Sequence, residues 1–397
     1  MFLTNEGQMK HSWTMVFGTV LLWTAAAAAQ LGLPRPVAHV AHDQTAAPVA
    51  YVYVSTTPAN SSNYEVAGYA AAADGKLTAI DGSPFTENVT DLVTNAKHLF
   101  GSNQNGIDID AYSIASDGAI EYASATDIVQ GKNCDTALTL FLDRTGASLY
   151  NLDYDGNECA NTTYQSFAIN PSTGKLTILD EAGASPELVT ALSFIANNHF
   201  GYGSSCYHFN PLIYGFARTR NGALKQLSSS PAMPTAPAYE NYCPTGAAAD
   251  AANHVAIAVQ PMEGYGATAG SYQLATYTTN ASGLLTTTST YTNMPSVLVG
   301  NVTDLEASPA GNLLAVAGTS GLQIFRFNGA SPIAKVTGLL ANVEIDHVAW
   351  DKNNHLFAIG QTAGKMYVFT VTPTAATEVS GSPYAVSSPT SVAVHPL

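Results

Sequence analysis

Three aspartates recur at matching places in the sequence and could perform acid–base chemistry together. Each opens a short stretch typical of a β-strand: Asp91, Asp304 and Asp346. In four further repeats a threonine takes this place: Thr139, Thr190, Thr245 and Thr390. Converging carboxylates raise one another's pKa until one can act as a general acid, or they bind a cation together. The alternative is that each Asp or Thr accepts a backbone N–H at the start of its own strand.

Histidines divide into one candidate and one repeated group. His347 directly follows Asp346 and is the one histidine beside the aspartate and threonine set, so it is a catalytic candidate. Four others share one turn position in successive repeats: His98, His199, His254 and His355. A residue type that recurs with the repeat indicates a role in the turn rather than in catalysis.

Segments between the strands supply further candidate ligands. Asp153, Asp155 and Glu158 place oxygen ligands close together, as a Ca²⁺ site requires, without the ligand order of an EF-hand. Other side chains in or beside such segments could stack on a sugar or hold a peptide: Tyr202, Tyr207, His208, Tyr265 and Tyr272. The alternative is that these tyrosines belong to the sheets themselves.

Composition excludes several kinds of partner. Of the 397 residues only 11% are charged, and 14 Lys and Arg face 29 Asp and Glu. Without a basic face, nucleic acid and anionic membrane surfaces are poor partners, and a phosphorylated substrate is disfavoured. We expect a monomer that binds a small molecule, a carbohydrate or a protein.

The N-terminus has the pattern of an export signal. Lys10 and His11 precede an apolar run at 13–23, and small residues at 25–29 suggest cleavage after Ala29. The alternative is a membrane anchor, but the apolar run is short for a span. Residues 1–29 are therefore predicted to be a signal peptide and 30–49 a leader, in a secreted or periplasmic protein without a membrane span after cleavage. Translation could start at Met1 or Met9.

Internal repeats predict the fold. The stretch 302–337 contains four short runs with period-2 alternation, separated by turns. Its Asn-Gly turn has counterparts along the chain: Asp74-Gly75, Asp117-Gly118, Thr173-Gly174, Asn221-Gly222 and Ser282-Gly283. Seven units can be aligned, but the last stops after one strand at 390–397, whereas the first begins with a second strand at 51–55. Residues 50–397 are thus predicted to form an all-β, seven-bladed propeller of four-stranded antiparallel blades, closed by the C-terminal strand.

Blade motifs resemble a known family. YVYVS at 51–55, GKLTAIDGSPF at 75–85, TGKLTIL at 173–179 and SGSPY at 380–384 are similar to those of YVTN-repeat and lactonase-type propellers. That family includes bacterial 6-phosphogluconolactonase and fungal muconate-lactonising enzymes. The resemblance implies a lactonase site of His, Glu and Arg around the central channel, but no catalytic residue can be carried over to this sequence. Ser-His-Asp, P-loop and HExxH patterns are missing as well.

In a four-stranded meander the long loops and the starts of the first strands share one face. The long loops at 56–64, 153–164, 203–211 and 260–271 therefore lie with the aspartates. All four cysteines map there too, which predicts the disulfides Cys134–Cys159 and Cys206–Cys243. We expect an exported scaffold that binds through this face. The alternative is a lactonase-type hydrolase or isomerase that uses the acidic ring, so whether the chain is an enzyme stays open.

Overall fold

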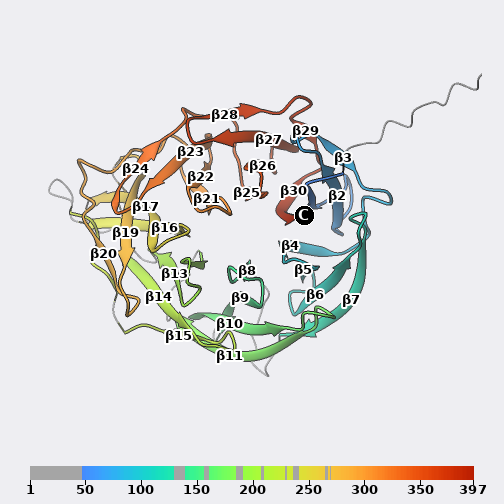
Figure 1. Ribbon diagram of the computed structural model, residues 1–397, viewed down its shortest axis with the longest axis horizontal. Helices are drawn as coiled ribbons and strands as arrows, with labels where there is room; N and C mark the ends of the chain where they lie inside the picture. Colours follow the sequence, from blue (N-terminus) through green and yellow to red (C-terminus); the bar gives the residue numbers. More distant parts are fainter. Residues whose placement is uncertain are drawn as a thin grey trace, which may run out of the picture. The chain divides into compact units, whose positions relative to one another are not determined.

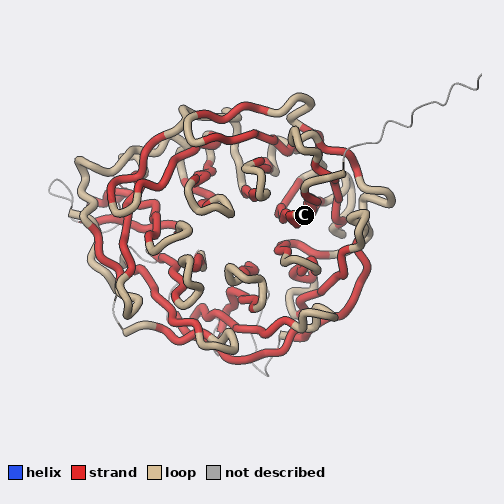
Figure 2. Tube along the Cα trace, in the orientation of Figure 1, coloured by secondary structure: helices blue, strands red, loops and turns tan. Residues whose placement is uncertain are grey.

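The computed structural model describes residues 47–128, 139–155, 161–184, 191–206, 210–228, 230–235, 241–263, 267–268 and 270–397. These residues form seven antiparallel sheets arranged in a ring (Figure 1), which confirms the predicted propeller. Strands joined mostly by short turns make up the described chain (Figure 2). The described residues contain no helix long and apolar enough to cross a membrane.

The seven blades succeed one another around the ring, and within each blade the innermost strand, nearest the channel, is named first. The first has β30 (Pro389–Pro396), β1 (Ala50–Thr56), β2 (Glu65–Ala71) and β3 (Leu77–Ala79). The second has β4 (Val89–Thr94), β5 (His98–Asn103), β6 (Asp108–Ile114) and β7 (Ile120–Asp127). The third has β8 (Thr139–Leu142), β9 (Ser148–Asp155), β10 (Asn161–Ile169) and β11 (Leu176–Ala184).

The remaining blades repeat this order. The fourth has β12 (Ser193–Phe194), β13 (Phe200–Ser205), β14 (Leu212–Arg218) and β15 (Leu224–Gln226). The fifth has β16 (Asn241–Ala249), β17 (His254–Glu263), β19 (Gln273–Thr279) and β20 (Leu285–Thr287), with β18 (Ala267–Thr268) paired to β17. The sixth has β21 (Val302–Ala307), β22 (Leu313–Gly318), β23 (Gly321–Asn328) and β24 (Ser331–Lys335). The seventh has β25 (His347–Trp350), β26 (His355–Gly360), β27 (Lys365–Thr372) and β28 (Ala375–Glu378), with β29 (Tyr384–Ala385) paired to β27.

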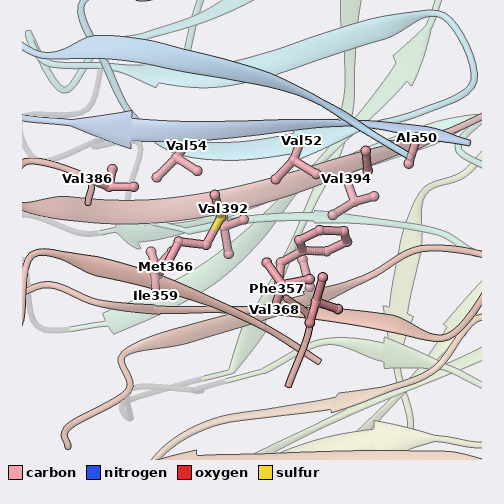
Figure 3. Packing of buried hydrophobic residues seen from close by; sticks show 13 residues of the cluster. Ala50, Val52, Val54, Phe357, Ile359, Met366, Val368, Val386, Val392 and Val394 are labelled. Carbon is pink, nitrogen blue, oxygen red and sulfur yellow. The ribbon is translucent and has the colours of Figure 1, made fainter. Parts of the chain in front are cut away.

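The ring closes as predicted, because β30 pairs with β1 in an antiparallel register that sets Val52 opposite Val394. Valines of these two strands pack against the seventh blade, including Phe357 and Met366 (Figure 3). Burying such side chains contributes roughly 1.5–3 kcal/mol each. The first and last blades are therefore held together by a continuous apolar core.

Tyrosine hydroxyls tie neighbouring blades together. Tyr53 Oη donates to the carbonyl of Gly118 at 2.8 Å, and Tyr202 Oη donates to that of Gly283 at 2.8 Å. Both glycines have positive φ and lie in the predicted hairpin turns of the next blade. A Cβ at Gly283 would lie 2.5 Å from the ring of Phe200, so this turn needs glycine for space as well as for φ. The prediction that Tyr202 binds a ligand from a loop is wrong: its ring is a buried tie between blades.

The repeated histidines belong to turns, as predicted. His254 and His355 each bond through Nδ1 to an aspartate four residues earlier, Asp250 and Asp351, at 2.6 Å. The same aspartates accept backbone N–H groups of the turn. Each Asp–His pair therefore fixes the turn between the first and second strands of its blade.

The predicted disulfide Cys206–Cys243 is present and joins the end of β13 to β16. The second predicted pair, Cys134–Cys159, falls outside the described residues. A crosslink across 37 residues stabilises the folded chain by about 4 kcal/mol in the chain-entropy account. It also holds the segment that follows β13 to the next blade.

A buried ion pair joins the third and fourth blades. Arg218 Nη2 lies 2.5 Å from Asp143 Oδ2, and these side chains are 13% and 0% exposed. The same guanidinium donates to Ser148 Oγ at 2.8 Å and to Tyr150 Oη at 3.2 Å. All these contacts bridge from β14 to the beginning of β9 or the turn before it, so the pair fixes how the two blades meet.

Replacing Arg218 by methionine should lower the free energy of unfolding by about 3–5 kcal/mol, because the charge of Asp143 would remain buried without its partner. Denaturant unfolding followed by tryptophan fluorescence measures the change. The matched control is Lys76→Ala, which breaks an ion pair whose side chains are 55% and 58% exposed, and should leave stability nearly unchanged. Equal effects of the two substitutions would contradict a structural role for the buried pair.

Candidate functional site

The innermost strands of the blades surround a central channel of about 830 Å³. Its mouth lies where these strands begin, and the turns that end them lie at the opposite face. The segment between β1 and β2 is at the mouth face, because Thr56 pairs with Pro389 at the start of β30. The loops predicted to share a face with the acidic ring therefore do so where the chain is described.

Side chains at the mouth cover the free edges of neighbouring strands. Asp91 Oδ2 accepts the N–H of Leu140 at 2.7 Å, and Asp304 Oδ2 accepts that of Val348 at 2.9 Å. In both cases the donor lies in the first strand of the following blade. Each aspartate therefore accepts a backbone N–H, but from the following blade rather than from its own strand as considered above; Asp304 also bonds its own strand, through Leu305.

For two members of the predicted ring, the residue that lines the channel is the next one in the sequence. Asp346 does not line the channel, because its Oδ2 accepts the N–H of Gln361 at 2.7 Å. Thr390 does not line it either, since its hydroxyl contacts Ser55 and the carbonyl of Thr90. The following residues, His347 and Ser391, line the channel instead. In a strand a shift of one residue moves a side chain to the opposite side, which explains the error.

The other predicted site residues are found in different places. Thr139 and Thr245 line the channel, whereas Thr190, Tyr207, His208, Tyr265 and Glu158 fall outside the described residues. Asp153 and Asp155 lie in strand β9 rather than in a loop. Tyr272 packs against the core cluster between the fifth and sixth blades. The described residues contain no group of three or more acidic, histidine or cysteine side chains that could hold a metal ion.

His347 and two aspartates form the charged part of the mouth. Nδ1 of His347 lies 3.8 Å from Asp304 Oδ2, with 45% of the His347 side chain exposed. Burial raises the pKa of Asp304 and of Asp91, while a positive charge on His347 lowers both. The imidazole therefore interacts electrostatically with both carboxylates at the mouth.

Glu306 is a further acidic residue that the sequence interpretation missed. It follows Asp304 by two positions in β21, so both side chains point to the same side of the strand, about 7 Å apart along it. Its Oε2 is enclosed by protein and has no hydrogen-bond partner. Burial, together with the charge of Asp304, raises the pKa of Glu306 well above its ordinary value. The available signal was a second acid at period-2 spacing from Asp304 in a predicted innermost strand.

Arg144 is the one lysine or arginine among the described channel-lining residues, and it lies at the far end. It belongs to the turn between β8 and β9. Its Nη1 donates to the carbonyls of Phe194 at 3.2 Å and Asp250 at 3.1 Å. Burial lowers the pKa of this guanidinium. Arg144 thus fastens three blades together at the turn face and does not reach the acidic mouth.

Comparison with known proteins gives the fold but no family. No family model matches the chain, and no curated protein sequence matches it. Among solved structures, a Bacteroides uniformis protein provisionally named a 6-phosphogluconolactonase has a TM-score of 0.64 and 13% identity, over 87% of this chain and 99% of its own. A similarly named Bacteroides fragilis protein has a TM-score of 0.61 and 14% identity, over 87% and 97%.

A third similar structure is the periplasmic gluconolactonase of Pseudomonas aeruginosa. It has a TM-score of 0.61 and 15% identity, over 87% of this chain and 98% of its own. Likeness at such identities establishes a shared fold and leaves the reaction to the residues of the site. The chain has the seven-bladed propeller arrangement of these lactonase-like structures.

Proposed function

We propose that the channel mouth hydrolyses a lactone by general acid–base catalysis. The observation that carries this proposal is Glu306, a carboxyl group of raised pKa whose Oε2 has no hydrogen-bond partner, two residues along the strand from Asp304 of the His347–Asp304 pair. Leaving a buried carboxyl group unpartnered costs stability, and such a cost is typical of functional sites. A proton donor and a proton acceptor at one mouth are what ester hydrolysis needs.

The proposed reaction assigns one role to each group. His347, whose Nδ1 lies 3.8 Å from Asp304 Oδ2, takes a proton from water while the water oxygen bonds to the lactone carbonyl carbon. The bond from that carbon to the ring oxygen then breaks, and Glu306 gives its proton to the leaving oxygen. The new carboxylic acid releases its proton, and the proton on His347 returns to Glu306 through solvent. The sum is one lactone plus one water giving one hydroxycarboxylate and one released proton.

The fold comparison supports lactones as substrates, and the disulfide supports a location outside the cytoplasm. Two similar structures carry provisional 6-phosphogluconolactonase names and another is a periplasmic gluconolactonase, which makes lactones the first substrates to test. A disulfide persists in oxidising compartments, in keeping with export by the signal peptide predicted at residues 1–29. We therefore propose action in the periplasm or outside the cell.

A binding scaffold is the second candidate function. The Cys206–Cys243 disulfide fixes one segment of the loop face, and a fixed loop loses less entropy on binding a carbohydrate or protein. Ligand-dependent thermal shifts without lactone turnover would favour this second function. They would also move attention from the channel to the loops.

Glu306→Gln should lower kcat for lactone hydrolysis by about 10²–10⁴-fold, because glutamine keeps the shape but cannot donate the proton. Proton release by the purified mature protein, over sugar and aliphatic lactones, measures the rate. Asp346→Asn is the matched control: it removes a carboxylate near the mouth that does not line the channel, and should leave kcat unchanged. Full activity of the Glu306→Gln variant would remove Glu306 from the mechanism.

The same substitution should change how stability depends on pH. In the folded protein the pKa of Glu306 is raised from an ordinary value of 4.5, so its favourable contribution is complete below that value. As pH rises through the folded pKa, the buried group must ionise or the chain unfolds, and this contribution is lost. Glu306→Gln should therefore become more stable relative to wild type as pH increases from 4.5, as measured by denaturant unfolding across that range. Parallel stability curves would show that Glu306 is not buried as described.

A further inference from the structure

We infer that the channel selects uncharged lactones that carry an apolar chain and rejects phosphorylated ones. This inference rests on the proposed lactone hydrolysis and specifies its substrate. It follows from where charge and apolar surface lie along the depth of the channel.

The charges at the mouth oppose a phosphate group. Asp91 and Asp304 line the channel at its mouth and Glu306 lines it two residues deeper, and His347 is the basic group among them. Phosphate sites in proteins use arginine or lysine, which supply charge and several N–H donors. The one guanidinium that lines the described channel, on Arg144, is at the far end and already donates to two carbonyls. A phosphorylated lactone with its ring at the mouth would thus set its phosphate among carboxyl groups.

Below the mouth, apart from Glu306, the channel wall becomes largely apolar. Residues two or three positions further along the innermost strands lie about 7–10 Å deeper. Those that are apolar, partly exposed and part of the channel lining are Val93, Phe141, Leu142 and Ala307, which also pack against the cores between blades. An apolar chain that extends from a lactone ring at the mouth would contact these side chains, and hydrophobic contact of this kind favours longer chains.

The far end of the channel limits the length of the apolar chain on the substrate. The innermost strands end at the turns, about four residues beyond the mouth, where Arg144 bridges Phe194 and Asp250. A chain entering from the mouth therefore meets a polar, charged group at the turn face. The channel is suited to a chain of medium length with its polar ring at the mouth.

Hydrolysis of two matched pairs of lactones tests this selection. The purified protein should hydrolyse γ-decalactone with at least tenfold higher kcat/KM than γ-valerolactone, which has the same ring and a methyl substituent. It should hydrolyse glucono-δ-lactone faster than 6-phosphoglucono-δ-lactone. Turnover of all four lactones without a chain preference, or with a preference for the phosphorylated one, would overturn the inference and leave the lactonase proposal standing.

A variant tests whether the channel lining causes the preference for longer chains. Ala307→Phe narrows the apolar section, so it should abolish the advantage of γ-decalactone while γ-valerolactone is still hydrolysed. Continued turnover of the short substrate shows that the variant is folded. Ala375→Phe, the same change at an exposed position in β28, should leave both rates unchanged. An Ala307→Phe variant that keeps the chain preference would overturn the inference.

If no lactone is hydrolysed, the lactonase proposal fails. Binding measurements then test the preference for apolar chains by themselves. Calorimetry with 2-hexylcyclopentanone and cyclopentanone compares ligands that have the ring and the chain but no ester bond to break. Tighter binding of the hexyl compound, lost in Ala307→Phe, would uphold selection of apolar chains by a channel that only binds. Equal binding, or binding of neither compound, would overturn the inference.

Discussion

Every blade of this propeller has an innermost strand with one edge that no other strand covers. The N–H groups along that edge need acceptors, because an unpaired backbone group costs free energy when it is buried. At the mouth the acceptors are side chains of the preceding blade. Asp91, Asp304 and Ser391 each take one N–H from the neighbouring first strand. The carboxylates that could perform chemistry are thus part of the blade-to-blade contacts, so their positions are as rigid as the ring.

The acidic groups of the channel differ in whether they have this backbone role. Asp91 and Asp304 accept N–H groups that stabilise their charged forms, whereas Glu306 has an oxygen without any partner. The same strand therefore supplies a carboxylate hydrogen-bonded to the backbone and, two residues deeper, a carboxyl group whose burial raises its pKa. When two carboxyl groups have different surroundings, one can serve as the acid while the other supports the base.

The fold was predictable because its signals are local. Alternation with period 2 and glycine turns mark each hairpin, and unmatched strands at 51–55 and 390–397 indicate the ring closure. The site was less predictable because it depends on register. Irregular pairing interrupts β4 between Val89 and Leu92, and β21 between Val302 and Asp304, so aligning equal letters gave Asp346 where His347 faces the channel. Burial of Tyr202 and the missing partner of Glu306 arise from packing between blades, for which a single sequence carries no local pattern.

Closure by β30 also sets the order in which the molecule can be made. Ser55 and Thr390 meet across 335 residues of sequence, so the first blade stays incomplete until the ribosome has synthesised β30. Until then β1, whose residues are all buried in the finished ring, presents an uncovered edge of the kind that promotes aggregation. Pairing of segments so far apart in sequence is intrinsically slow, so we expect closure by β30 to come late in folding.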